Sequence, residues 1–229
     1  MFERARETEM QTQTSYPIAE IFESIQGEGR WAGHWTTFVR LAGCNVGVKK
    51  TDVSATCTSV CGQEFTCDTD FYTIEARMTV EEIRKKCSTE NVCLTGGEPF
   101  IHNLEPLVSC LSEAEHFVSI ETSGTRGFPL GVLGHSVWIS CSPKAGFLAE
   151  NAEWVNEWKC LVQHPEDEVN IEVFMKEHFG DAMPAEVYLQ PVNHQLMIDP
   201  GTHRIVCDML RRHPSWRLST QLHKILGMR

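Results

Sequence analysis

The sequence predicts an α/β fold in which short strands alternate with helices around a parallel sheet. Short apolar runs, rich in β-branched and aromatic side chains, recur between stretches with helical periodicity. Several of these runs are followed directly by polar segments that contain Gly or Pro. The length of 229 residues suits one sizeable core, slightly above the usual range of about 100–200 residues per domain. Repeated βα units indicate a parallel sheet, either open or closed into a barrel.

The elements follow one another in a regular order. The first predicted strand is Thr36–Gly43, and a helix runs from Thr79 through Lys86, where Thr79 and Glu82 have the spacing of a capping box. A short apolar strand, Asn91–Thr95, precedes the segment GGEP. The other predicted strands are Phe117–Thr122, Val137–Cys141, Trp158–Val162, Glu186–Gln190 and Trp216–Gln221, and the other predicted helices are Leu104–Ala114, Glu166–His178 and Pro200–Arg212. Asp199 suits the N-cap of the last helix, with Pro200 at its first position.

The ends of these strands carry the polar segments GGEP, ETSG, SPK and QP, each directly after a predicted strand. Parallel α/β folds place their sites at the carboxyl ends of the strands. We therefore expect a functional site there. Residues 1–15 are polar and aperiodic and predict a mobile tail, and no repeat, linker or domain boundary is visible beyond them.

Charge narrows the function classes. The 20 Lys and Arg stand against 31 Asp and Glu, a formal charge of −11, which disfavours nucleic acids and anionic membranes as partners. The longest Lys/Arg run is the three residues Arg84-Lys85-Lys86, and no apolar stretch approaches the roughly 20 residues that span a bilayer. The first 15 residues lack the apolar core of a signal peptide. We expect a cytoplasmic protein.

The ten cysteines of a cytoplasmic chain do not predict a disulfide framework, because that compartment keeps thiols reduced. Four lie close together in the sequence, with the spacing Cys44-x12-Cys57-x3-Cys61-x5-Cys67. Thiolates favour zinc, copper(I) or iron–sulfur clusters, but the absence of a CxxC pair weakens a tetrahedral zinc site. The other six are predicted to be small core residues: Cys87, Cys93, Cys110, Cys141, Cys160 and Cys207.

The motifs around these cysteines form an ordered series. They are SIQGEG at 24–29, RLAGCN at 40–45, CDT at 67–69, LTGGEP at 94–99, ETSG at 121–124, SPK at 142–144, LQP at 189–191 and QLHKILG at 221–227. From about residue 16 to the C-terminus this series resembles the 7-carboxy-7-deazaguanine synthases, a family of radical S-adenosylmethionine enzymes. GGEP alone indicates only the wider superfamily, whereas SIQGEG, RLAGCN, CDT and the terminal His-Lys are specific to this family.

The resemblance implies a partial, abbreviated (β/α) barrel at 16–229, with a cysteine-containing insert at about 45–66. It also implies that three cysteines hold a [4Fe–4S] cluster whose fourth iron binds S-adenosylmethionine. Cys44 and Cys67 match the motifs directly. Most relatives use CxxxCxxC, which is absent here, so the middle ligand is either Cys57 or Cys61.

A local argument favours Cys57 as the middle ligand. Two β-prone arms flank Cys61-Gly62, and a two-residue turn there would pair Val60 with Gln63 and Cys57 with Thr66. Cys57 would then lie beside Cys67, with Cys61 at the hairpin tip. A longer turn, or none, would favour Cys61.

The resemblance also carries over contacts for the cofactor and the substrate. The cofactor contacts are Gly97, Glu98, Glu121, Ser123, Ser142, Pro143, Lys144, Gln190, Pro191, Val192 and Asn193. The substrate contacts are Ile25, Gln26, Gly27, Glu28, Arg40, Thr95, His223 and Arg229, with Glu121 facing either ligand. Taken alone, these segments would be ordinary turns, loops or strand ends.

Two residues of these motifs have specific alternatives. Arg40 on a buried strand needs an anion, which is either a substrate carboxylate or a core carboxylate in a salt bridge. In the family, the hydroxyl that corresponds to Thr69 ligates Mg²⁺, a cation that prefers oxygen ligands. Alternatively, Thr69 caps a turn.

The activity that the resemblance implies is the conversion of 6-carboxy-5,6,7,8-tetrahydropterin to 7-carboxy-7-deazaguanine and ammonia, on the route to 7-deazapurines such as queuosine precursors. The cofactors would be the [4Fe–4S] cluster, S-adenosylmethionine and Mg²⁺. A flavodoxin or ferredoxin would donate electrons, and a homodimer follows by analogy. Two alternatives are another small radical enzyme, such as a glycyl-radical activase, and a non-catalytic zinc-binding domain.

Overall fold

The computed structural model describes residues 14–49, 55–67, 69–193 and 199–228. The strands are β1 (Ser15–Ile25), β2 (Trp35–Leu41), β3 (Val48–Lys49), β4 (Ala55–Thr58), β5 (Glu64–Cys67), β6 (Ala76–Thr79), β7 (Asn91–Gly96), β8 (Phe117–Thr122), β9 (Val137–Cys141), β10 (Glu157–Val162), β11 (Val187–Pro191) and β12 (Arg217–Leu218). The helices are α2 (Val80–Lys86), α3 (Glu105–Glu113), α4 (Leu130–Leu133), α5 (Asp167–Phe179), α6 (Pro200–Arg212) and α7 (Leu222–Ile225), with 3-10 turns η1 (Pro99–Ile101) and η2 (Ala149–Trp154).

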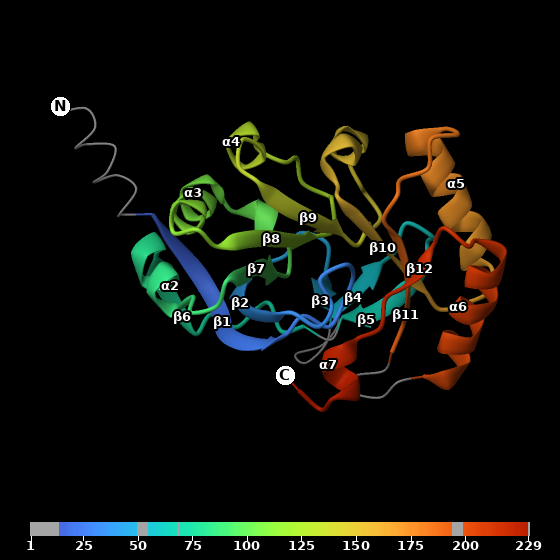
Figure 1. The fold of residues 1–229 in the computed structure, drawn as a ribbon, viewed down its shortest axis with the longest axis horizontal. Helices are drawn as coiled ribbons and strands as arrows, with labels where there is room; N and C mark the ends of the chain where they lie inside the picture. Colours follow the sequence, from blue (N-terminus) through green and yellow to red (C-terminus); the bar gives the residue numbers. More distant parts are fainter. Residues whose placement is uncertain (1–13, 50–54, 68, 194–198, 229) are drawn as a thin grey trace.

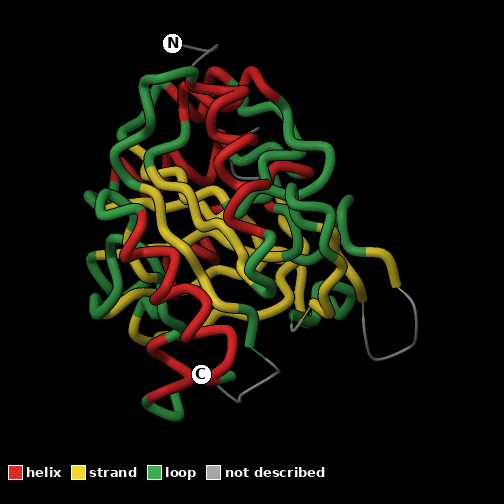
Figure 2. Tube along the Cα trace, turned by 90° about the vertical axis from the view of Figure 1, so that its right-hand side faces the viewer, coloured by secondary structure: helices red, strands yellow, loops and turns green. Residues whose placement is uncertain are grey.

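One curved sheet organises the molecule. Its nine strands have the order β12-β11-β10-β9-β8-β7-β2-β1-β6. The pairs from β2 to β12 are parallel, and β1 is antiparallel to both β2 and β6. Helices α2 to α6 lie outside this sheet (Figure 1), and the strands run through the middle of the molecule (Figure 2). The predicted partial (β/α) barrel is confirmed, because β6 and β12 form two separate edges.

Most predicted elements are present. Phe117–Thr122, Val137–Cys141 and Pro200–Arg212 have the predicted bounds. The capping box of α2 is confirmed: Glu82 N donates to Thr79 Oγ1, and Thr79 N donates to Glu82 Oε2. Asp199 caps α6 by accepting from Gly201 N at 2.7 Å.

The antiparallel edge was not predicted. β1 begins at Ser15, inside the predicted tail, whose first 13 residues fall outside the described part of the chain. Glutamates at 20 and 23 interrupt the apolar pattern of β1, which obscured the strand. The last predicted strand was too long, since only Arg217–Leu218 pairs with β11.

Two apolar clusters hold helices on the outer face of the sheet. One joins β2, β7 and β8 to α2 and α3, and the other joins β10 and β11 to α5 and α6. Trp158 of β10 is fully buried in the second cluster, and burying one large side chain of this kind contributes about 2–3 kcal/mol. Its neighbour Lys159, also buried, lines the cavity inside the barrel, as expected for alternation along a strand.

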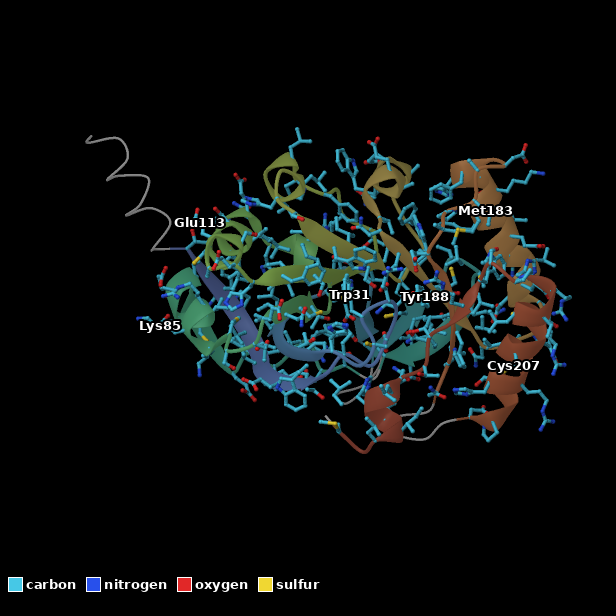
Figure 3. The ribbon with its side chains drawn as sticks, viewed as in Figure 1. Trp31, Lys85, Glu113, Met183, Tyr188 and Cys207 are labelled. Atoms are coloured by element: carbon cyan, nitrogen blue, oxygen red, sulfur yellow. The ribbon has the colours of Figure 1, made fainter. Side chains whose placement is uncertain are left out.

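The predicted burial of the six scattered cysteines is only partly correct. Four are buried, Cys110 is half-buried and Cys207 is exposed on α6 (Figure 3). Cys207 lies on the polar side of a helix that buries Val206 and Met209 instead. Among the described residues, no helix is both long and apolar enough to cross a membrane.

Candidate active site

A cavity of about 1620 Å³ opens at the carboxyl ends of the parallel strands. It brings together most of the residues that the motifs singled out. Those lining it are Ile25, Gln26, Glu28, Arg40, Cys44, Cys57, Cys67, Thr69, Thr95, Gly97, Glu121, Ser123, Ser142, Lys144, Gln190, Pro191, Val192, Asn193 and His223. Gly27, Glu98, Pro143 and Cys61 do not line it, and Arg229 lies outside the described residues.

The loop after β2 exposes the first thiol to this cavity. Val46 N and Gly47 N donate to Cys44 Sγ at 3.4 and 3.3 Å. Burial raises the pKa of the Cys44 thiol, and these two N–H groups oppose that rise. N–H donors aimed at sulfur stabilise a thiolate, so the loop favours Cys44 as a metal ligand.

The other two thiols of the cavity lie on the β4–β5 hairpin. Cys57 pairs with Phe65, and Ala55 pairs with Cys67, so both cysteines are on one face of the ribbon at diagonal positions. Their side chains are in hydrogen-bond contact, and this contact together with burial raises the pKa of Cys57. The predicted proximity of Cys57 and Cys67 is therefore present.

The predicted register of that hairpin is wrong by one residue. Ser59 N donates to Gln63 O at 2.9 Å, and Gly62 has φ +79°, so the tip is a three-residue loop with a left-handed glycine. The predicted pairing of Cys57 with Thr66 would have placed Cys67 on the opposite face, because a slip of one residue reverses the faces of a strand. The longer turn brings the two thiols together.

Cys61 lies at the hairpin tip and is directed away from the cavity. Val60 and Cys61 pack against the apolar cluster under α5 and α6, and Cys61 Sγ is 3.9 Å from Asp167 O. Burial raises the pKa of this thiol to about 11. The hairpin is also tied to the SPK segment, since Ala145 N donates to Thr58 O at 2.9 Å and Lys144 Nζ lies 5.3 Å from the ring centre of Phe65.

Glu98 of the GGEP segment, a predicted cofactor contact, does not line the cavity. It is fully buried, and it accepts hydrogen bonds from Phe100 N at 3.1 Å, Thr122 Oγ1 at 2.8 Å, Ser123 N at 2.8 Å and Ser123 Oγ. Most of these hydrogen-bond donors belong to the ETSG segment. Glu98 therefore fixes two cavity loops to each other.

Gly97 of the same segment touches the cysteine loop. A Cβ atom at this position would lie 2.4 Å from Gly43 O and 2.5 Å from Cys44 Cβ, closer than real Cβ contacts. Only glycine fits there without displacing backbone, so GGEP backs directly onto the first thiol.

The interior of the barrel holds a charged network that sequence reasoning missed. Lys159 of β10 is 4% exposed, and its Nζ donates to Glu28 Oε2 at 2.7 Å and to Glu121 Oε1 at 3.1 Å. Gln190 and Gln221 each donate from Nε2 to Glu28 Oε1 at 3.0 Å. Although burial alone would raise the pKa of Glu28, the charge of Lys159 holds it below its usual value. A lysine in the middle of the apolar strand EWKCLV was the available signal.

Two predicted cations of the cavity have protein partners. Arg40 Nε donates to Glu20 Oε1 at 2.8 Å, so the core salt bridge considered as an alternative is present, although Arg40 still lines the cavity. Lys144 Nζ donates to Ser142 O at 2.8 Å and to Ser142 Oγ at 2.6 Å, and burial lowers the pKa of this lysine.

Gly27 supports the site from behind the cavity wall. A Cβ at Gly27 would lie 2.2 Å from His223 Nδ1, and Leu222 N donates to Gly27 O at 3.0 Å. Gly27 itself does not line the cavity, because α7 covers it, and its predicted contact with the substrate stays a prediction. His223 and Lys224 of α7 line the cavity in its place.

Comparisons of the sequence and of the structure with known proteins agree with each other. The 7-carboxy-7-deazaguanine synthase of Synechocystis sp. is 36% identical over 220 residues, covering 94% of this chain and 94% of the relative. The Bacteroides thetaiotaomicron and Escherichia coli K12 proteins of that name are 34% and 30% identical, with 93% of this chain covered in each and 98% and 99% of the relatives. The crystal structure of QueE from Escherichia coli superposes with a TM-score of 0.70 at 26% identity, covering 94% of this chain and 98% of that one. No family model matches.

Proposed function

We propose roles for the site residues from one premise: the chain belongs to the 7-carboxy-7-deazaguanine synthase family, whose members are radical S-adenosylmethionine lyases. Its activity is the ring contraction of 6-carboxy-5,6,7,8-tetrahydropterin to 7-carboxy-7-deazaguanine with loss of ammonia. Because the chain belongs to this family, it is neither a glycyl-radical activase nor a non-catalytic zinc-binding domain.

Cys44, Cys57 and Cys67 are the cluster ligands in this proposal. All three line the cavity, and each comes from a segment that fixes its position. Among the described residues, no three His, Cys, Asp or Glu side chains are close enough to hold one metal ion. A [4Fe–4S] cluster does not require three ligands on one metal ion, because each thiolate binds a different iron.

When bound, the cluster and S-adenosylmethionine would supply the radical chemistry that removes hydrogen from the substrate. The chain positions that chemistry. Gly97 lets the GGEP backbone approach the thiols, and Glu98 fixes the ETSG loop beside it. Lys144 and Ser142 would bind S-adenosylmethionine from the opposite wall, where the hairpin meets the SPK segment.

The substrate lies over the charged network in this proposal. Glu28 and Glu121 are acceptors for the N–H groups of the pterin ring, and Arg40 with His223 faces its carboxylate. Thr95 Oγ1 donates to Glu121 Oε2 at 3.0 Å and fixes that carboxylate further. Thr69 remains the proposed Mg²⁺ ligand, since it lines the cavity two residues after Cys67.

Three further assignments belong to the same proposal. The compartment is the cytoplasm, where reduced thiols are available for a cluster. A flavodoxin or ferredoxin donates the electron, and the chain forms a homodimer.

The test is anaerobic turnover followed by mass spectrometry. Iron- and sulfide-reconstituted protein is incubated with S-adenosylmethionine, reductant, Mg²⁺ and the carboxytetrahydropterin. We expect 7-carboxy-7-deazaguanine without stoichiometric 5′-deoxyadenosine, which would show that the cofactor is regenerated. Accumulation of 5′-deoxyadenosine without the product would contradict the substrate, and neither compound would contradict both assignments.

A further inference from the structure

Lys159 is the most buried cation of the cavity, and the motifs give it no role. It lies on β10, between β9 and β11, and is 4% exposed. A lysine at such a position is costly unless its charge is paired. Its two partners come from distant segments: Glu28 follows β1, and Glu121 lies on β8.

The hydrogen bonds of this cluster leave a defined set of atoms unused. Glu28 accepts from Lys159, Gln190 and Gln221, and Glu121 accepts from Lys159, Gln26 and Thr95. A carboxylate accepts about four hydrogen bonds, and an ammonium donates three. Each carboxylate therefore keeps about one acceptor site, and Lys159 keeps one N–H with no acceptor among the described residues.

This remaining set is complementary to one chemical class. The two acceptor sites match a planar ring that presents an amino group beside a ring N–H, which is the aminopyrimidinone edge shared by pterins and deazaguanines. The match requires both carboxylates to be ionised. Two carboxylates in one buried site do not both stay ionised without a cation between them.

We propose that Lys159 is a positioning residue that keeps Glu28 and Glu121 ionised and oriented as acceptors for the aminopyrimidinone edge of the ligand. The proposal rests on the proposed function, because it concerns the ring that the same cavity binds. Lys159 acts through the two carboxylates, and its role is specificity for the ring rather than radical chemistry.

Other titratable groups surround this cluster and enter its pH dependence. Those that interact with its three members are Glu157 on β10, His223 on α7, Cys93 on β7, Cys141 on β9 and Lys144 after β9. Glu157 Oε2 accepts from Arg30 N at 2.8 Å and Oε1 from Ser140 Oγ at 2.6 Å, so its carboxylate is already bonded. Comparing each variant with the parent protein at every pH removes the contribution of the unchanged groups.

The experiment measures the affinity of the reconstituted protein for 7-carboxy-7-deazaguanine, the stable product, between pH 7 and 9. The parent should bind with nearly constant affinity. Lys159→Met should bind about 10- to 100-fold more weakly at pH 7 and recover as the pH rises, because one carboxylate takes up a proton at neutral pH. The double variant Lys159→Met/Glu121→Gln should lose this pH dependence, since one carboxylate then remains.

Several outcomes would overturn the proposal while the proposed function stands. They are equal affinity of Lys159→Met and the parent at pH 7, a loss of affinity that is the same at every pH, and a pH dependence that persists in the double variant. Iron content and S-adenosylmethionine binding should stay at parent values and show that the variant is folded. If Lys159→Met does not fold, Lys159→Arg decides, because the retained charge should keep the affinity independent of pH. Failure of the parent itself to bind the product would contradict the proposed function instead.

Discussion

The β4–β5 hairpin and the charged network inside the barrel line the same cavity, but they bring their side chains together in different ways. On the hairpin, Cys57 and Cys67 are brought together by a single turn. In the barrel, the bonds of Glu28 to Lys159, Gln190 and Gln221 span sequence separations of 131, 162 and 193 residues. The hairpin is a local structure, whereas the network exists only when the whole sheet is assembled.

The two regions also differ in how charge is balanced. Burial raises the pKa of Cys44, and the contact with Cys67 together with burial raises the pKa of Cys57, so these thiols favour their neutral form until a metal binds. In the barrel, Lys159 already compensates the carboxylates, and the pKa of Glu28 is lowered. The cluster site therefore needs its metal to be complete, whereas the proposed ring-binding site is complete within the chain.

The largest effect is expected from removing a hairpin thiol. Cys57→Ala or Cys67→Ala should abolish cluster assembly, because two thiolates do not hold the three irons that need protein ligands. Iron and sulfide analysis after anaerobic reconstitution measures the loss. Cys61→Ala is the matched control on the same hairpin and should keep its iron. Retention by Cys57→Ala and loss by Cys61→Ala would show that the tip, and not the β4 strand, supplies the ligand.

The next largest effect tests the contact between the GGEP and ETSG loops, the second of which carries Glu121 of the network. Glu98→Gln keeps the side-chain shape but places an amide against donors from Phe100, Thr122 and Ser123, and it should lower the free energy of unfolding by about 2–4 kcal/mol. Denaturant unfolding measures this change. Glu113→Gln on the outer side of α3 (Figure 3) should change stability by less than about 0.5 kcal/mol. Equal effects of both substitutions would contradict the structural role of Glu98.

A smaller effect is expected at the hairpin tip. Cys61→Ala removes a side chain that packs under α5 and should destabilise the protein by about 1 kcal/mol without loss of iron. Cys207→Ala on the exposed side of α6 is the matched control and should be neutral. Thermal unfolding of both variants gives the comparison, and an unchanged Cys61→Ala would mean that the tip is not anchored there.

The smallest expected effect is on how steeply the folding stability falls with pH. Because the pKa of Glu28 is lower in the folded chain than its usual value near 4.3, its contribution to stability is present above that value and is lost as the pH falls through the folded pKa. Glu28→Gln should therefore show a shallower loss of stability between pH 5 and 3. Glu153→Gln, an exposed carboxylate, should keep the parent slope in acid unfolding curves. Identical slopes for Glu28→Gln and the parent would remove Glu28 from the acid response.

The strand–helix order and most of the residues that line the cavity could be predicted from the sequence alone. Phe117–Thr122 and Val137–Cys141 were predictable because apolar pattern and turn residues act within a few positions, and capping of α2 follows from Thr79 and Glu82 in the same way. The motif series likewise placed Cys44 and Gly97 in one site, since segments at the carboxyl ends of neighbouring parallel strands must meet.

Tertiary structure decided what depends on register and distant partners. The three-residue tip of the hairpin, and not the sequence of its arms, set which face Cys57 and Cys67 share. The roles of Glu98 and Lys159 could not be predicted locally, because their hydrogen-bond partners come from other parts of the chain. Local patterns report which residues repeat along a strand, but a charge buried in a barrel acquires its role only from the side chains that the fold brings against it.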